Sequence, residues 1–158
     1  PEDSLSGELR LKGYVSAMKS AHLPIDARFI FRGQHSEQTG RDALDYWMSL
    51  PNELAPTAVV AVSDLMAIGV MNEAEQRGLV IGHDLSVIGF DDAPMSQYTR
   101  PALTTLQQPI PEIAAEVVAM LEYSMSKHSA QPELASRPRH ALLPPNLIVR
   151  ESCGAPIR

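Results

Sequence analysis

Residues 57–92 read TAVVAVSDLMAIGVMNEAEQRGLVIGHDLSVIGFDD, and this stretch decides the fold. Its first six residues form a continuous apolar run rich in valine, which is typical of a strand buried on both faces. A helix is predicted over about 65–77, with a glycine directly after it as the usual C-terminal stop. A second apolar run, at 85–90, predicts the next strand. A strand, a helix and a strand in this order indicate parallel pairing through a right-handed crossover.

The sequence before this stretch continues the alternation. A helix is predicted over 6–21, a short strand over 27–33 and a second helix over 38–50, each from the spacing of its apolar residues. The side chains expected to face the core are Leu11, Tyr14, Val15 and Met18 in the first helix, and Ala43, Leu44, Trp47 and Met48 in the second. Strands and helices therefore alternate from residue 28 to residue 90, and the predicted fold class is α/β, a parallel sheet flanked by helices.

The sequence after this stretch predicts one more strand at 102–106 and a long helix that opens at Pro109. The helix carries an apolar stripe of Ile110, Ile113, Ala114, Val117, Val118, Leu121 and Met125. Residues 126–139 are polar and contain proline, so they are expected to form a loop. Residues 140–152 are expected to form a pair of strands broken at two consecutive prolines.

Two adjacent carboxylates, Asp91 and Asp92, stand where the 85–90 strand ends. Aspartate starts turns well because it accepts hydrogen bonds from nearby backbone amides. The carboxyl ends of strands in a parallel sheet are also where small molecules bind. Both explanations stay open from the residues alone. Similarly, Ser63 and Asp64 follow the first strand, and either can cap the next helix.

Composition restricts the function. The 158 residues suffice for one domain with a core, and the net charge of −6 disfavours binding of this chain to a phosphate backbone. Cys153 is the only cysteine, which excludes an intrachain disulfide and is compatible with a reducing cytoplasm. No apolar stretch reaches the ~20 residues of a membrane helix, and no signal peptide is recognised. The chain starts with Pro1, so it is interpreted as a processed or truncated piece.

Catalytic and cofactor motifs are missing from the sequence. It contains neither GxGxxG nor GxxxxGK, which cradle phosphates, and no GxSxG elbow. The five histidines are scattered without metal-ligand spacing. We therefore expect no cofactor, no metal and no enzymatic activity.

Several motifs together resemble the lac/galactose repressor family of bacterial transcription regulators. In chain order they are SGELRLKGYVSAM, AVVAVSDLMAIGVMNEAEQRGLVIGHDLSVIGFDD, RPALTTLQQP and LLPPNLIVRES. The resemblance implies a core of two α/β lobes, similar to periplasmic sugar-binding proteins, with the ligand cleft between the lobes. It also implies a helix-turn-helix segment for DNA binding, which this chain lacks.

The resemblance also divides the chain. Residues 1–102 are expected to be most of the C-terminal lobe, and residues 103–126 a crossover strand and helix that belong to the N-terminal lobe. Residues 127–139 would be a loop, and residues 140–158 the terminal strands and tail. The chain is thus interpreted as an incomplete fragment of the two-lobe fold, whose apolar stripe has lost the lobe it packs against.

By the resemblance, five residues are expected to bind the ligand. Asp91 corresponds to the acid that bonds ligand hydroxyls, whereas Asp92 is expected to stay at the surface and to bond the following loop. Arg10 falls on the pocket arginine, and Gln108 follows the LTTL strand where a polar pocket or hinge residue is common. Ser63 replaces a frequent asparagine, and His35 replaces a frequent aromatic ring, so the particular sugar is not transferable.

The resemblance further implies a homodimer in which Ile68 and Met71 contribute to the interface. The expected function is the effector-binding and dimerisation part of a cytoplasmic regulator, most simply a repressor, that responds to a sugar or a similar small polar metabolite. Its operator DNA would be bound by the missing segment. The alternatives are a periplasmic sugar-binding receptor of a transport system and an uncharacterised α/β enzyme.

Overall fold

The computed structural model describes residues 5–130 and 140–154 of the chain. Within it, the chain separates into two compact units. The first unit runs to Leu106 and resumes at Leu147, and the second unit spans Gln107–Asn146.

The first unit is built on a four-stranded sheet in the order β1-β2-β3-β4. The strands are β1 (Ala58–Val60), β2 (Ser86–Asp91), β3 (Thr104–Gln107) and β4 (Asn146–Ile148). Strands β1 and β2 are parallel, with Val59 opposite Val87, and helix α3 (Asp64–Gln76) connects them. The strand, helix and strand predicted within residues 57–92 are therefore confirmed.

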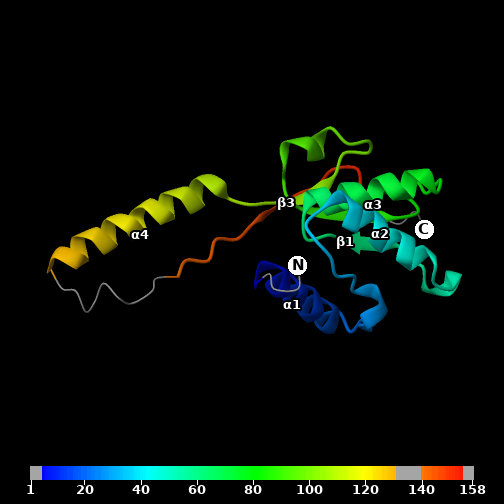
Figure 1. The fold of residues 1–158 in the computed structure, drawn as a ribbon, viewed down its shortest axis with the longest axis horizontal. Helices are drawn as coiled ribbons and strands as arrows, with labels where there is room; N and C mark the ends of the chain where they lie inside the picture. The colour runs from blue at the N-terminus through cyan, green and yellow to red at the C-terminus, as the bar shows by residue number, and fades with distance from the viewer. Residues whose placement is uncertain (1–4, 131–139, 155–158) are drawn as a thin grey trace. The chain divides into compact units, whose positions relative to one another are not determined.

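Helix α2 (Glu37–Met48) packs directly on α3, and the two lie side by side in Figure 1. Glycines allow this close approach. A Cβ added at Gly40 would overlap the carbonyl oxygen of Met66 and lie 2.9 Å from the amide nitrogen of Val70. A Cβ added at Gly69 would overlap the carbonyl oxygen of Glu37. The backbones of α2 and α3 thus touch without intervening side chains.

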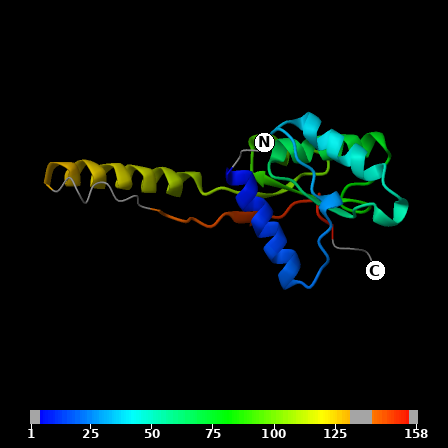
Figure 2. The same cartoon turned by 60° about the horizontal axis from the view of Figure 1, so that its bottom comes forward.

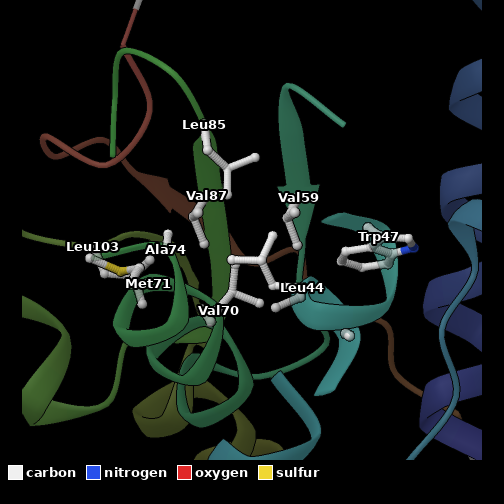
Figure 3. Packing of buried hydrophobic residues seen from close by; sticks show 12 residues of the cluster. Leu44, Trp47, Val59, Val70, Met71, Ala74, Leu85, Val87 and Leu103 are labelled. Atoms are coloured by element: carbon white, nitrogen blue, oxygen red, sulfur yellow. The ribbon is translucent and has the colours of Figure 1, made fainter. Parts of the chain in front are cut away.

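The core lies between this helix pair and one face of the sheet (Figure 3). Its buried apolar residues are Ala43, Leu44, Trp47, Val59, Ala61, Ala67, Val70, Met71, Ala74, Leu85, Val87 and Leu103. The inner face predicted for the second helix is confirmed, since Ala43, Leu44 and Trp47 are buried and Met48 packs against them. The indole Nε1 of Trp47 donates a hydrogen bond to the carbonyl of Arg28 at 3.1 Å.

Helix α1 (Leu5–Ser20) forms where the sequence predicts it, but none of its residues is buried. Figures 1 and 2 both show it apart from the α2–α3 pair. Its recorded side-chain contacts include an ion pair between Glu8 and Arg32 at 2.8 Å and the placement of Arg10 over the ring of Phe90. Successive strand residues point to opposite faces, so Phe90 faces away from the side on which Val87 is buried. The Arg10 contact therefore places α1 on the sheet face opposite α3.

The prediction that β1 is buried on both faces is wrong. Val59 is buried, but Ala58 is exposed and Val60 is 61 % exposed. The strand order puts β1 at the edge of the sheet, and the α2–α3 pair covers only one of its faces. An apolar sequence allows a strand to be buried on both faces, but burial also requires a helix or another segment on each face.

The strand predicted over 27–33 is also absent from the sheet that the described residues form. Residues Ala27–Phe29 form a turn of 3₁₀ helix instead, because the side chain of Asp26 accepts the amide of Arg28 at 2.9 Å and caps it. The following residue, Ile30, is extended. A strand needs a hydrogen-bonding neighbour, and this segment lies outside the order β1-β2-β3-β4. A second 3₁₀ turn, Asn52–Leu54, precedes β1.

The crossover strand lies in the first unit. Leu103, Thr104 and Thr105 are buried, and β3 is the third strand of this unit's sheet. The residues from Gln107 on belong to the second unit. The assignment of residues 103–126 to the N-terminal lobe of the two-lobe fold stays a prediction.

The second unit contains helix α4 (Ile110–Ala130). The helix runs into the loop expected at 126–139, and the rest of that loop lies outside the described residues. The apolar stripe is largely exposed, with Val117 at 51 % and Leu121 at 58 %. Of the two strands expected over 140–152, only β4 is formed, since consecutive prolines supply no amide for a ladder.

Candidate functional site

The candidate site lies at the carboxyl ends of β1 and β2. The parallel pairing puts both ends at the same edge of the sheet. Ser63 and Asp64 follow β1, Asp91 is the last residue of β2, and Asp92 comes directly after it. A short 3₁₀ turn, Pro94–Gln97, comes after the second pair. Four polar residues from two strands therefore meet where α/β proteins bind small ligands.

Ser63 is the N-cap of α3. Its backbone is extended, and its hydroxyl accepts the amide of Met66 at 3.3 Å. The residue is 7 % exposed. A hydroxyl has one donor and two acceptor positions, so Ser63 caps the helix and still has a proton to donate. The two roles considered for Ser63 are compatible.

Asp91 and Asp92 both occupy a part of backbone space that non-glycine residues rarely adopt. Their φ angles are 123° and 55°. Such conformations are strained and persist only where the surroundings hold them, and they occur frequently at ligand sites. Asp91 is the last residue of β2 and is half-buried. These backbone angles support the turn explanation of the two acids, and the ligand explanation stays a prediction.

The carboxylate of Asp92 forms hydrogen bonds within the protein. Its Oδ1 accepts Arg150 Nη2 at 2.6 Å and the hydroxyl of Ser96 at 3.3 Å. The bond to Ser96 agrees with the prediction that Asp92 bonds the following loop. The prediction that Asp92 stays at the surface is wrong, because its side chain is only 14 % exposed beside Arg150. Arg150 was not singled out from the sequence, yet it also donates to the carbonyl of Leu103 at 2.8 Å. This arginine therefore joins the chain after β4 to the turn after β2.

Asp64 has a role that the sequence analysis did not identify. It is 1 % exposed, and its carboxylate accepts the amide of Ala93 at 2.7 Å and the hydroxyl of Thr105 at 2.5 Å. Burial raises the pKa of Asp64, the two hydrogen bonds oppose this, and the negative charges of Asp91 and Asp92 raise it further. Its position next to a cap residue gave the only signal in the sequence.

Gly89 makes room for the Asp64 carboxylate. A Cβ at this position would overlap Asp64 Oδ1 and lie 3.0 Å from Leu103 Cδ2. A glycine inside a strand weakens the strand and often marks such a close approach. The glycine in VIGF and the aspartate in SDL are thus parts of one packing arrangement.

Arg10 lies beside the end of β2. The central carbon of its guanidinium is 3.9 Å from the ring centroid of Phe90, which is a cation–π contact. Phe90 directly precedes Asp91 in β2, so Arg10 lies beside the same end of this strand. The planar guanidinium suits vicinal hydroxyls or a carboxylate.

The remaining predicted residues lie elsewhere in the chain. His35 is exposed and lies two residues before α2 begins. Gln108 belongs to the second unit. Ile68 is half-buried at the margin of the core, whereas Met71 is 5 % exposed within it. Met71 therefore offers little surface to a second copy, and Ile68 remains the better candidate for an interface.

Within the described residues, 5–130 and 140–154, no group of three or more histidine, cysteine, aspartate and glutamate side chains is arranged to hold a metal ion. In the same part of the chain, no helix has the length and apolarity needed to cross a membrane.

Known proteins with similar sequences are bacterial regulators. Residues 1–153 match the family described as periplasmic binding protein-like domain. The chain is 38 % identical to the HTH-type transcriptional repressor CytR of Escherichia coli (strain K12) over 121 residues, which is 77 % of this chain and 35 % of that protein. It is 41 % identical over 109 residues to the probable HTH-type transcriptional repressor ExuR of Bacillus subtilis (strain 168), covering 69 % of this chain and 32 % of that protein.

Solved structures give the same result. A regulatory protein of the LacI family from Chloroflexus aggregans superposes with a TM-score of 0.82 at 40 % identity, covering 98 % of this chain and 53 % of that chain. A LacI-family transcriptional regulator from Enterococcus faecium with bound ribose superposes with a TM-score of 0.75 at 29 % identity, covering 94 % and 52 %. The chain thus spans about a third of the length of the curated relatives and about half of the solved chains.

Proposed function

Because the chain belongs to the periplasmic binding protein-like domain family, in the form carried by LacI-family regulators, we propose that it is the effector-binding part of a bacterial transcription repressor. The observation that carries the proposal is the strained Asp91 at the carboxyl end of β2, with Arg10 placed on the neighbouring Phe90. The effector we propose is a sugar or a similar small polar metabolite. The ribose in the Enterococcus faecium regulator supports this class.

The residues at this edge suit a polyol. A carboxylate such as Asp91 accepts hydrogen bonds from two hydroxyl groups. The hydroxyl of Ser63 can donate a proton while it caps α3. The guanidinium of Arg10 supplies further donors in a fixed plane. The acceptor oxygens of Asp91 and the donors of Ser63 and Arg10 together match sugar hydroxyls, which both donate and accept hydrogen bonds. We propose that the ligand is bound without chemical conversion.

The response to the ligand would be a shift between two arrangements of the complete, dimeric protein. A ligand changes DNA affinity only if it binds one arrangement more tightly than the other. With a net charge of −6, this chain is a poor partner for the DNA phosphate backbone, so we propose that the operator contacts come from another segment. We also propose that the protein acts in the cytoplasm, where operator DNA is found.

A thermal-shift screen of the complete gene product tests the proposal. D-ribose and a panel of pentoses and hexoses are added, since a ligand that binds the native state raises the unfolding temperature. Asp91→Ala should abolish the shift, because hydrogen bonds to a charged group are worth about 1.5–3 kcal/mol each, or roughly 10- to 100-fold in affinity. Asp42→Ala is the matched control, since Asp42 is an exposed acid on α2.

Operator binding is measured on the same variants by gel shift. Asp91→Ala should still bind operator DNA but no longer respond to the sugar. A variant that keeps normal sugar affinity and loses DNA binding would contradict the proposal, as would a wild-type protein that no sugar in the panel stabilises.

A further inference from the structure

The turn formed by Asp91 and Asp92 is held from within the first unit. Two successive non-glycine residues with positive φ do not adopt this conformation spontaneously, so the surrounding structure must stabilise it. The groups that contact this turn therefore determine where Asp91 points.

Asp64 holds two backbone amides of the turn, one directly and one through Thr105. One carboxylate oxygen accepts the amide of Ala93, the residue directly after the two acids, at 2.7 Å. The other accepts the hydroxyl of Thr105, and the Thr105 oxygen in turn accepts the amide of Asp92 at 3.4 Å. The amides of two consecutive residues, Asp92 and Ala93, are thus fixed by Asp64, one directly and one through β3.

Helix capping does not account for Asp64. Ser63 already caps α3 by accepting the amide of Met66. Both hydrogen bonds that the Asp64 carboxylate is seen to make go outside α3. The structure also accommodates this acid at a cost, because it is buried beside two other carboxylates and needs a glycine at position 89. A small apolar residue would fill such a position more easily.

We propose that Asp64 is a positioning residue of the effector site: together with Thr105 it holds the Asp91–Asp92 turn in the strained conformation that presents Asp91 to the ligand. This inference rests on the proposed function for the part that concerns the ligand. Arg150 holds Asp92 from the opposite direction, through its carboxylate rather than its amide.

Asp64→Asn in the complete gene product is the first test. The amide keeps one oxygen as acceptor, so at most one of the two accepted bonds survives unchanged, and the other is lost or reversed in direction. Hydrogen exchange followed by mass spectrometry on the peptide that contains residues 91–95 should become at least tenfold faster. The matched control is Asp84→Asn, since Asp84 also accepts a backbone amide, that of Val80 at 2.8 Å. In the control, exchange should change near residue 80 and stay unchanged at 91–95.

Thr105 variants separate positioning from general stability. Thr105→Val has the same shape without the hydroxyl and should also accelerate exchange at 91–95. Thr105→Ser restores the hydroxyl and should restore slow exchange. For D-ribose, calorimetric affinity should fall at least tenfold in Asp64→Asn and Thr105→Val and recover in Thr105→Ser.

The inference is overturned if exchange at residues 91–95 is unchanged in both Asp64→Asn and Thr105→Val. It is equally overturned if exchange accelerates while D-ribose affinity stays at the wild-type value. A wild-type protein that binds no sugar refutes the proposed function instead, and the exchange measurement then still decides whether Asp64 holds the turn.

Discussion

Gly69→Ala should destabilise the protein, although alanine normally stabilises a helix relative to glycine. Gly69 lies inside α3 and faces the start of α2. A Cβ at this position would overlap the carbonyl oxygen of Glu37 and lie 2.8 Å from the carbonyl carbon. Because the obstacle is backbone, no rotamer change relieves the overlap, and α2 must move away from α3.

The magnitude follows from two opposing effects. Replacing a helical glycine by alanine gains about 1 kcal/mol of helix propensity. Overpacking a core costs about 1–3 kcal/mol, and a rigid obstacle puts this site at the upper end of that range. The expected net loss in the free energy of unfolding is about 2 kcal/mol. With a urea m-value of about 2 kcal/mol/M, the midpoint falls by roughly 1 M.

Equilibrium urea unfolding of the complete gene product measures this loss. Circular dichroism follows the helices, and the fluorescence of Trp47, the chain's only tryptophan, reports on α2. Gly13→Ala is the matched control, because a Cβ there meets no atom within 4 Å in α1. The control should be neutral or more stable by up to about 1 kcal/mol.

The reasoning is refuted if Gly69→Ala is as stable as the wild type or more stable. That result would mean that α2 and α3 do not touch through their backbones, and that Gly69 is an ordinary helix residue.

Three further predictions concern the site edge and the surface. Arg150→Met should lower the free energy of unfolding by about 2 kcal/mol in urea titrations, because it leaves the largely buried carboxylate of Asp92 without its cationic partner. Arg77→Met, which breaks exposed ion pairs, should lower it by less than about 1 kcal/mol. Equal losses in the two variants would contradict this prediction. Burial raises the pKa of Asp64, so the folded state binds a proton on this carboxyl group more tightly than the unfolded chain does. The stability that protonated Asp64 contributes is therefore complete below its ordinary pKa of about 4 and is lost as the pH rises through the raised pKa. Urea midpoints between pH 4 and 7 should therefore fall more for wild type than for Asp64→Asn, and parallel profiles would count against it. Ile68→Asp should shift the complete protein from dimer to monomer in sedimentation velocity, because it places a charge in the predicted interface. An unchanged dimer would contradict the interface prediction.

Several elements could be predicted because their signals are local. The strand–helix–strand motif β1–α3–β2 follows from two apolar runs of strand length with a helical stretch between them. Each of these elements begins and ends within two residues of its predicted bounds. The same holds for α1 and α2, whose apolar residues repeat at helical spacing. Asp91 became a candidate because a polar residue at a strand's carboxyl end is visible in the sequence itself, and the family resemblance selected it over Asp92.

Other features depended on elements that the local pattern does not contain. The run at β1 looks like a doubly covered strand, but Val60 is 61 % exposed because the helix pair covers one face only. The apolar segment at 27–33 has strand composition, yet it joins no ladder of the described sheet, and Asp26 caps a 3₁₀ turn at its start. Composition predicts what a segment can do with a neighbour, and it does not say whether the neighbour is present.

By itself the sequence determined the order of helices and strands, the cap at Ser63 and the acid at the end of β2, since each depends on residues a few positions apart. Only the tertiary structure decided how the acid is held. Asp64 meets Thr105 across 41 positions and Arg150 meets Asp92 across 58, and in both pairs β3 or the chain after β4 has to come beside β2 first. Hydrogen bonds act over about 3 Å, so partners that far apart in sequence are chosen by the topology of the sheet and leave no periodic trace in the chain.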